Sequence, residues 1–503
     1  MNRSGERVMA LAKLLGAMEC PKAYRDLPLR GLCQDSREVE PGDLFFALSG
    51  SKNSGLNFID QAVKRGASAI AVDRRLYEAI PYPPVPLIPL HNLSEILSGL
   101  ASKFYGNPSE RLHISSVTGT NGKTSCCWLI SELVNQLGAK TGFIGTLGHG
   151  TRAAELTFNG SMRETNLTTP DSISLQKILA DFEEQGVEMV ALEASSHALA
   201  QGRLDGVDID DAVFTNLSRD HLDYHLDMAS YGEAKALLFE KPGVNFAVLN
   251  LDDAFSQKLI KKTELGTELL TYSLDNASAD IYCRDIKLDI QGLSAQVVSP
   301  WGEGQLQSPL IGQFNLANLL SVIATVGTRY PFSEVLSKLP MLKSPAGRME
   351  LVNAEAKPSV IVDYAHTPDA LEKVLITLRS HGRGKLWVVF GCGGERDIGK
   401  RSKMGAIAER YADYVVITND NPRGESEEAI ISHIKMGMIG KVVVEMDRRS
   451  AIRHAISHAS PDDLILIAGK GHEEYQQLSH QTFAFSDQMQ AKLALNDLTG
   501  AGL

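Results

Sequence analysis

Cysteine and long apolar runs are scarce in this sequence, and both absences narrow the classes of protein that it can encode. Its 503 residues include six cysteines, and no two of them form a C-x-x-C pair. This excludes a disulfide framework, disfavours a zinc site, and predicts reduced thiols and a cytoplasmic location. No window approaches 18 consecutive apolar residues, so the sequence predicts no membrane-spanning helix.

Positive charge is also in deficit. The chain has 50 Lys and Arg against 61 Asp and Glu, which gives a formal net charge of −11. An acidic chain repels polyanions, so we expect neither a nucleic-acid partner nor a membrane surface, although a small anion can bind at a local positive site. Near the N-terminus, Met9–Met18 is interrupted by Lys13 and predicts a short amphipathic helix, not a signal peptide.

The length of the chain predicts about three domains. Five prolines between residues 81 and 89 mark the first boundary, because they oppose a helix or a central strand. The next segment, Leu93–Tyr105, predicts a helix that Gly106-Asn107-Pro108 ends. A second boundary is predicted at Pro340–Gly347. The predicted domains are residues 1–108, 109–340 and 341–503.

Short apolar runs alternate with helical periods through the middle and last segments. Such alternation predicts an α/β fold with mainly parallel sheets and right-handed crossovers. The predicted middle strands are 113–117, 141–147, 187–193 and 211–217, with helices at 123–137 and 172–185. The last segment is predicted to hold strands at 385–391, 413–418 and 463–469 and a helix at 403–411.

The most specific motif is SVTGTNGKTSCCWLI, in which an apolar strand leads through a glycine-rich turn into an amphipathic helix. Backbone N–H groups in such a turn bind phosphate oxygens, Lys123 supplies positive charge, and the Thr124 hydroxyl can bind Mg²⁺. The motif departs from G-x-x-x-x-G-K-[ST], because Val117 occupies the position of the first glycine. An ordinary glycine turn is the alternative, but the flanking strand and helix favour nucleotide binding. The predicted nucleotide-binding residues here are Gly119, Thr120, Asn121, Gly122, Lys123, Thr124 and Ser125.

A polyphosphate also needs a divalent metal with hard oxygen ligands, and Glu193 is the candidate for this role. It ends the run VEMVALE, at the carboxyl end of a strand, where open α/β sheets bind ligands. The alternative is a surface carboxylate. Asp220, His221, Asp223 and His225 follow the run DAVFTNL, but histidines in an exposed loop are more often solvated or capping than metal-binding.

The remaining candidate functional residues are Lys235 and residues of two later loops. Lys235 lies in YGEAKALLFE, and its position predicts a lysine on a helix surface. The glycines in WVVFGCGGERDIGKR follow a strand, but their spacing is not G-x-G-x-x-G, so dinucleotide binding has weak support. In TNDNPRGE, Arg423 can bind a carboxylate through two hydrogen bonds, and Pro422 stiffens its loop. The alternative is an Asx-Pro turn with an exposed arginine.

Ten sequence blocks together resemble the Mur ligases. In chain order they are GTNGKT, EASSHAL, NLSRDHLDYH, YGEAKALLF, GQFNLANLL, GRME, VDYAHTPDAL, GCGGERDIGKR, DNPR and AGKGHE. The resemblance runs from DSREVEPGDLF to AGKGHEEYQ and so covers nearly the whole chain. One departure is Asn166-Leu167-Thr168-Thr169, where many relatives read N-T-T-P.

The resemblance implies three α/β domains: one that binds a UDP-sugar, a central P-loop ATPase, and a C-terminal Rossmann-like domain that binds the incoming amino acid. It implies catalytic roles for Lys123, Glu193, His221 and Lys235, with Lys235 carbamylated, and Mg²⁺ at Thr124, Glu193, His221 and Lys235. Asn315 and Arg348 are implied as further ATP contacts. Ser36, Thr168, Thr169, Ser195, Gln201 and Arg203 are implied to bind the UDP-substrate. Arg396, Asp420, Asn421, Pro422, Arg423, Gly469 and Glu473 are implied to bind diaminopimelate.

The implied activity is ATP-dependent addition of meso-2,6-diaminopimelate to UDP-N-acetylmuramoyl-L-alanyl-D-glutamate by a monomeric enzyme of peptidoglycan synthesis. Two alternatives within the family are an L-lysine-adding ligase and a folylpolyglutamate-type ligase. The DNPR motif favours diaminopimelate, whose distal ammonium and carboxylate form a second zwitterionic head that lysine lacks. A non-catalytic P-loop regulator is the remaining alternative, and it leaves Arg396, Arg423 and Glu473 without a function.

Overall fold

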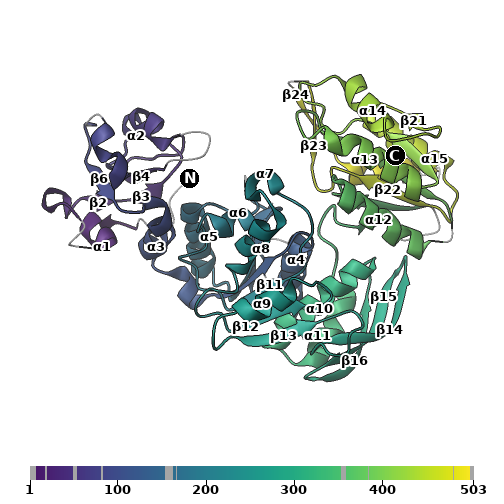
Figure 1. The fold of residues 1–503 in the computed structure, drawn as a ribbon, viewed down its shortest axis with the longest axis horizontal. Coiled ribbons are helices and arrows are strands. Elements are labelled where there is room, and N and C mark those ends of the chain that lie inside the picture. The colour runs from purple at the N-terminus through teal and green to yellow at the C-terminus, as the bar shows by residue number, and fades with distance from the viewer. Residues whose placement is uncertain are drawn as a thin grey trace. The chain divides into compact units, whose positions relative to one another are not determined.

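The structure of the protein is a computed structural model, which describes residues 7–16, 20–48, 54–80, 83–152, 162–165, 167–352, 358–382, 384–479 and 481–498. The chain forms two compact units, Met1–Thr271 and Tyr272–Leu503. Figure 1 labels their elements and colours the chain from purple at the N-terminus to yellow at the C-terminus. Within the described ranges, no helix has the length and apolar character needed to cross a membrane.

The first unit begins with a parallel sheet of four strands, in the order β3 (Gly31–Cys33), β4 (Asp43–Ala47), β5 (Ala69–Asp73) and β6 (Leu87–Leu90). Apolar side chains are buried on both of its faces. Pro89 lies in β6, at the sheet edge, where a strand tolerates a missing N–H. The other elements are β1 (Met9–Ala10), α1 (Leu11–Leu15), β2 (Pro28–Leu29), α2 (Ile59–Lys64) and α3 (Leu93–Tyr105), with 3-10 turns at Lys22–Tyr24, Gly55–Phe58, Arg74–Ala79 and Pro108–Arg111.

A seven-stranded sheet forms the rest of this unit. Its order is β13 (Glu268–Tyr272), β12 (Phe246–Asn250), β11 (Asp211–Phe214), β7 (His113–Thr118), β10 (Met189–Glu193), β8 (Thr141–Gly145) and β9 (Gly148–Arg152). The strands from β12 to β8 pair in parallel, and β9 pairs antiparallel to β8. The carboxyl ends of β10 and β11 therefore flank the segment that follows β7.

Helices cover this sheet. The helix α4 (Lys123–Gln136) contacts β7, β8 and β10. A separate core joins α5 (Ser172–Glu184), α6 (Ser196–Ala200) and α9 (Ser256–Lys262) to the sheet through residues such as Leu179, Leu199 and Leu259. Two more helices, α7 (Leu222–His225) and α8 (Met228–Ala236), lie between β11 and β12 in the chain.

The second unit begins with an antiparallel sheet of β14 (Tyr282–Asp289), β15 (Gly292–Ser299) and β16 (Gly302–Ser308). The helix α10 (Gln313–Gly327) follows, then α11 (Phe332–Lys338) and a 3-10 turn at Leu339–Met341. In α10, twelve of the fifteen residues are buried, so this helix belongs to the core on nearly all sides.

The second unit also contains a six-stranded sheet, of which Figure 1 labels β21 and β22. Its order is β17 (Glu350–Leu351), β18 (Ser359–Asp363), β22 (Leu464–Ala468), β19 (Leu386–Phe390), β20 (Tyr414–Ile417) and β21 (Val443–Val444), parallel except for β17. One core cluster includes α12 (Pro368–His381), α13 (Gly399–Tyr411) and α14 (Glu427–Lys435), and another includes α15 (Arg448–His458) and α16 (Asp487–Leu498). A hairpin of β23 (Tyr475–Leu478) and β24 (Gln481–Ala484) follows β22.

The predicted fold class is confirmed, and most predicted elements are present. The helix Leu93–Tyr105 has the predicted bounds, and Gly106 ends it in a left-handed conformation. The N-terminal helix is shorter than predicted, at Leu11–Leu15, and a strand precedes it. The boundary between the compact units, after Thr271, coincides with neither predicted domain boundary, and the domain limits stay a prediction.

Candidate active site

The glycine-rich turn between β7 and α4 has a backbone that only glycine fits. Gly119 has a φ of +152°, and a Cβ there would lie 1.9 Å from Thr215 Oγ1. Gly122 has a φ of +87° and is the N-cap of α4. The backbone N–H of Asn121 donates to Asn216 Oδ1 at 3.0 Å, so the loop after β11 holds this turn. The turn is therefore preorganised at a helix N-terminus, which is the geometry for binding an anion.

Lys123 lies folded over this turn. Its Nζ donates to Gly119 O and to Thr120 O, each at 2.9 Å. The Thr120 hydroxyl donates to Ser218 O at 3.1 Å, which links the turn to the loop after β11. A cation is thus held within the turn, as phosphate binding requires.

Glu193 is the centre of a hydrogen-bond network at the end of β10. It is fully buried, so the alternative of a surface carboxylate is wrong. Its Oε2 accepts from Thr124 Oγ1 at 3.0 Å and from Thr146 Oγ1 at 3.1 Å, while its Oε1 accepts from the Thr146 N–H at 2.8 Å. Gly145 leaves room for this carboxylate, because a Cβ there would lie 2.1 Å from Oε1.

The donors around Glu193 fit a magnesium ion. The Thr124 hydroxyl and the Glu193 carboxylate are adjacent hard oxygens, and Mg²⁺ commonly uses one or two such protein ligands with phosphate and water for the rest. Within the described ranges, no group of three or more His, Cys, Asp or Glu is placed to hold a metal. The fit therefore rests on two protein oxygens.

Lys235 contradicts the prediction of a surface lysine. It is in the last turn of α8 and only 1% exposed, because this turn packs against the glycine-rich turn. Its Nζ donates to Gly119 O at 2.7 Å and lies 4.4 Å from the centre of the Tyr231 ring. Burial lowers the pKa of this amine well below its usual value, and the nearby Lys123 lowers it further. The helix ends at Ala236, one residue after Lys235.

The predicted metal-shell residue His221 lies in a cluster of aromatic side chains. Its ring centre is 4.9 Å from that of His197, and its Nε2 is 3.4 Å from Asp220 Oδ2. The side chain of His221 is 45% exposed. By contrast, His225 is buried, and its Nε2 is 2.9 Å from Ser196 Oγ. The role of His221 at the metal stays a prediction.

The residues expected to bind the muramoyl-peptide part come together beside Glu193. Thr169 Oγ1 donates to Glu193 O at 2.6 Å and accepts from the Ser195 N–H at 3.0 Å. Arg203 Nη1 donates to Thr169 O at 2.8 Å, and its Nε donates to Gln201 Oε1 at 3.0 Å. Thr168 extends the network, since its Oγ1 accepts from Thr146 Oγ1 at 3.2 Å. Asn166, which precedes them, lies outside the described residues.

Ser36 lines a separate pocket of about 560 Å³ in the four-stranded-sheet region. Its Oγ donates to Gln61 Oε1 at 2.8 Å. The pocket walls combine polar groups with aromatic and aliphatic ones, which suits a nucleoside head group. They are formed by Gln34, Asp35, Ser36, Arg37, Phe45, Leu48, Gly55, Phe58 and Gln61.

The two remaining predicted ATP contacts belong to the second unit. Asn315 is buried in the first turn of α10, and its Nδ2 donates to Ile311 O at 2.8 Å. The guanidinium of Arg348 lies 4.6 Å from the centre of the Tyr364 ring, and its Nε is buried without a hydrogen-bond partner. Such an unsatisfied donor is available to an anionic ligand.

Three loops meet at the carboxyl end of the six-stranded sheet, after β19, β20 and β22. Arg423 Nη1 donates to Gly394 O at 2.8 Å, which joins the first two loops. Asn421 Nδ2 donates to Glu473 Oε2 at 2.9 Å, which joins the second to the third. A Cβ at Gly469 would lie 2.6 Å from Asp420 Oδ2. The parallel sheet therefore gathers a cation, an amide and carboxylates from distant parts of the sequence.

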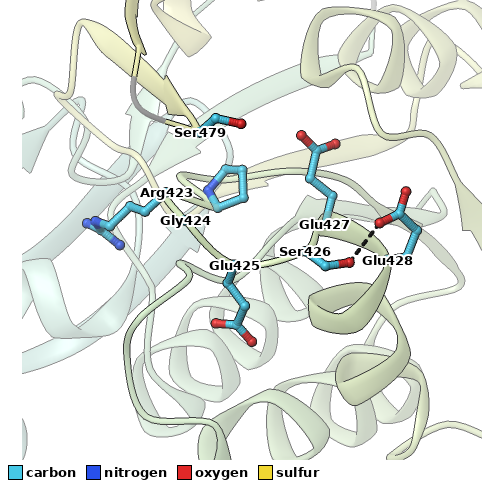
Figure 2. A pocket seen from close by; sticks show the side chains of 8 residues that line it. Arg423, Gly424, Glu425, Ser426, Glu427, Glu428 and Ser479 are labelled. Carbon is cyan, nitrogen blue, oxygen red and sulfur yellow. Dashed lines mark hydrogen bonds between the residues drawn. The ribbon is translucent and has the colours of Figure 1, made fainter.

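The loop that carries Pro422 and Arg423 also lines a pocket of about 520 Å³. Figure 2 shows the Arg423 side chain pointing away from Glu427 and Glu428, on the other side of the loop. Arg423 has a φ of +53°, and it is only partly exposed. The alternative of a fully solvated arginine is therefore wrong. Arg396 lies in the first loop and is exposed, with its Cγ 3.6 Å from the position of a Cβ at Gly393.

Comparison with known sequences agrees with this arrangement. Three Mur ligase family models match: the catalytic domain at residues 28–105, the middle domain at 117–326 and the glutamate ligase domain at 347–471. The chain is 48% identical over 478 residues to the UDP-N-acetylmuramoyl-L-alanyl-D-glutamate--2,6-diaminopimelate ligase of Pseudomonas aeruginosa, covering 94% of this chain and 96% of the relative. The chain belongs to the Mur ligase family. The ligase of the same name from Coxiella burnetii is 44% identical, with 93% and 96% covered.

Solved structures agree with the Mur ligase fold. A structure of a UDP-N-acetylmuramoyl-L-alanyl-D-glutamate--2,6-diaminopimelate ligase is similar with a TM-score of 0.73 and 34% identity, covering 98% of this chain and 99% of the other. A folylpolyglutamate synthase of Mycobacterium tuberculosis shares the fold alone, with a TM-score of 0.58, 19% identity and coverage of 73% and 90%.

Sequence reasoning gave no role to several side chains that hold the candidate residues of each unit in place. Thr146 holds both oxygens of Glu193, and Gln61 holds Ser36. Arg401 is buried and donates to Glu425 Oε1 and Oε2 at 2.6 and 2.8 Å. No spacing rule marks these residues, because their partners are distant in sequence.

Proposed function

We propose that this Mur ligase uses ATP to join meso-2,6-diaminopimelate to UDP-N-acetylmuramoyl-L-alanyl-D-glutamate, in peptidoglycan synthesis in the cytoplasm. The loop cluster of the second unit carries the proposal: Arg423, Asn421 and Glu473 bring a guanidinium, an amide and a carboxylate to one end of the sheet. A ligand head with one ammonium and one carboxylate needs complementary groups of this kind.

In the proposed reaction, the γ-carboxylate of the D-glutamyl residue takes the terminal phosphoryl group of ATP, and ADP leaves. The free amine of diaminopimelate then attacks the acyl phosphate, and phosphate leaves as the amide forms. Lys123 and the N–H groups of the turn neutralise and orient the phosphates, which is the main form of catalysis for phosphoryl transfer.

Thr124 and Glu193 would hold Mg²⁺ in this reaction. When bound, the ion supplies positive charge against the phosphates. Thr146 keeps the Glu193 carboxylate oriented through two hydrogen bonds, so the chain fixes this oxygen before any ligand arrives. We assign His221 to the same region, as the resemblance implies.

We propose that Lys235 is carbamylated. Its lowered pKa favours the neutral amine, which is the form that reacts with carbon dioxide. The amine nitrogen bonds to the carbon of CO₂ and releases one proton, and a carbamate replaces a cation. This change would remove the repulsion between two lysines, Lys235 and Lys123, beside the phosphates.

The UDP-substrate is assigned to the first unit, with its nucleotide part at Ser36 and its peptide part at Thr168, Thr169, Ser195, Gln201 and Arg203. Their network adjoins Glu193, which suits a substrate that presents a carboxylate to ATP. We keep the domain limits 1–108, 109–340 and 341–503 and a monomeric state as parts of the proposal.

The deciding experiment measures release of inorganic phosphate from ATP with UDP-N-acetylmuramoyl-L-alanyl-D-glutamate and one amino acid at a time. We expect release with meso-diaminopimelate and at most about one hundredth of that kcat/KM with L-lysine. Equal values for both would contradict the assignment. Release with a folate and glutamate would indicate a folylpolyglutamate-type ligase, and ATP binding without turnover would indicate a regulator.

A further inference from the structure

The loop cluster of the second unit contains a buried lysine that the proposed reaction does not use. Lys470 directly follows Gly469, and its side chain is 0% exposed. Its Nζ donates to Asn421 Oδ1 at 3.1 Å and to Glu473 Oε2 at 2.9 Å. The same Nζ is 5.3 Å from the centre of the Tyr475 ring.

Lys470 determines which way the Asn421 amide faces. Asn421 Oδ1 also accepts from the Gln477 N–H at 2.9 Å, and Asn421 Nδ2 donates to Glu473 Oε2 at 2.9 Å. Both groups around Oδ1 are donors, and Glu473 offers an acceptor to Nδ2. A flipped amide would place its NH₂ group against an ammonium and a backbone N–H, so one orientation is strongly favoured.

The two oxygens of the Glu473 carboxylate also differ in their contacts. Oε2 receives the Lys470 and Asn421 hydrogen bonds. Oε1 has no hydrogen bond from any residue that the structure describes, and the Glu473 side chain is 20% exposed. One oxygen is thus committed to the protein, and the other remains available to a ligand.

We infer that Lys470 is a positioning residue for recognition of the incoming amino acid, because it fixes the Asn421 amide and leaves Glu473 Oε1 for the ligand. The inference rests on the proposed function, which assigns Asn421 and Glu473 to that amino acid. Lys470 itself is fully buried, so it acts through these two side chains. Without its charge, Glu473 could rotate, and the amide could turn.

The test compares KM values for all three substrates in the full-length wild type and in Lys470→Met, which keeps most of the apolar stem but removes the ammonium. We expect KM for meso-diaminopimelate to rise about tenfold or more, since hydrogen bonds to charged groups are at stake. KM for ATP and for the UDP-substrate should stay within about twofold.

Two further variants separate positioning from general loss of stability. Leu378→Ala removes buried apolar volume from α12, in the same unit but outside the loops. It should lower the thermal stability without the selective rise in KM for meso-diaminopimelate. In an Asn421→Ala background, Lys470→Met should add less than about threefold to that KM, because the two changes disrupt one network.

Unchanged KM for meso-diaminopimelate in Lys470→Met, an equal rise for ATP, the same selective rise in Leu378→Ala, or full additivity with Asn421→Ala would each overturn the inference. If Lys470→Met does not fold, Lys470→Gln carries the same comparison, because it keeps a donor but not the charge. A wild type that turns over a different amino acid would contradict the proposed function, and the Lys470 comparison would then be made with that amino acid.

Discussion

Two buried lysines distinguish the glycine-rich turn of the first unit from the loop cluster of the second. Lys235 faces the carbonyl oxygen of Gly119 and lies near Lys123, so burial and a like charge oppose its protonation. Lys470 faces the Glu473 carboxylate and the Asn421 amide oxygen. Two lysines with similar burial therefore have different partners: a carbonyl oxygen and a like charge at Lys235, but a carboxylate and an amide oxygen at Lys470.

The regions also differ in how their geometry is fixed. The glycine-rich turn is one continuous segment, and its shape follows from Gly119 and Gly122 with support from the next loop. The loop cluster of the second unit is assembled from three loops, after β19, β20 and β22. A buried ion pair supports two of those loops, because Arg448 donates to Asp487 and also to the backbone oxygens of Asn419 and Ala468, where the loops begin. A continuous motif needs few outside contacts, while a dispersed site needs many.

The largest effect is expected from removing Lys235. We expect Lys235→Ala and Lys235→Met to lower kcat by about a thousandfold, because both remove the amine that we propose to be carbamylated. Lys235→Met keeps the buried volume, so its thermal unfolding should stay close to that of the wild type. The measurement is phosphate release from ATP with all substrates present.

Added short-chain carboxylic acids should partly restore activity to Lys235→Ala, whose cavity can admit them, and not to Lys235→Met. Wild-type kcat in a folded Lys235→Met protein would show that the buried amine has no role in catalysis. The environments of Lys235 and Lys470 would then differ in structure, and the Lys235 environment would have no consequence for catalysis.

Arg423→Ala is expected to have the next largest effect. On the proposed function, its loss would leave the distal carboxylate of diaminopimelate without a cation, and an unpaired charge of this kind costs a few kcal/mol. We expect kcat/KM for meso-diaminopimelate to fall about a hundredfold, with KM for ATP nearly unchanged. Arg379→Ala is the control, because its guanidinium forms an ion pair with Asp413 away from these loops. Equal losses in both variants would contradict a specific role for Arg423.

A pH-dependent effect is expected from His472, which lies two positions after Lys470 in the chain. Burial, with a contribution from Arg348, lowers the pKa of this imidazole to about 4 from 6.5. Between these pH values the unfolded chain binds a proton that the folded chain does not. The contribution of His472 to the free energy of unfolding is therefore fully present above pH 6.5 and is lost as the pH falls towards 4.

We expect His472 to account for about 1–2 kcal/mol of this loss, allowing for its partial exposure. Denaturant unfolding of the wild type and of His472→Gln at a series of pH values measures it. Between pH 7 and pH 4 the wild type should lose about 1–2 kcal/mol more of its free energy of unfolding than His472→Gln does. Parallel curves would show that the imidazole titrates alike in both states.

The smallest effect is expected at Gln61, where the hydrogen bond with Ser36 joins two neutral groups. Gln61→Ala should raise KM for the UDP-substrate about fivefold, equivalent to about 1 kcal/mol, and leave the other two KM values unchanged. Gln176→Ala serves as a control, because its amide donates to Gly206 O away from this pocket. If Gln61→Ala lowered kcat/KM for the UDP-substrate about a hundredfold, as expected for meso-diaminopimelate in Arg423→Ala, the hydrogen bond between neutral groups would matter as much as the charged contact. That result would contradict the ranking.

The sequence predicted the features that depend on neighbouring residues. The order of strands and helices follows from apolar periodicity and from glycine and proline signals, and Leu93–Tyr105 has the predicted bounds. The phosphate-binding turn was evident because its glycines, lysine and threonine are contiguous. Resemblance to the Mur ligases then assigned roles to the separate blocks, as residue types at single positions could not.

The tertiary structure decided the environment of each side chain. The sequence placed Lys235 on a helix but not against Gly119, since its burial depends on a segment 116 positions away in the chain. Glu193 could equally have been exposed, until the order of the parallel strands placed it beside Thr124 and Thr146. Lys470 lies in the block AGKGHE, but the sequence assigned no role to its side chain. Local preferences thus determined the elements, whereas burial, pKa and hydrogen-bond partners arose only when the sheets brought distant loops together.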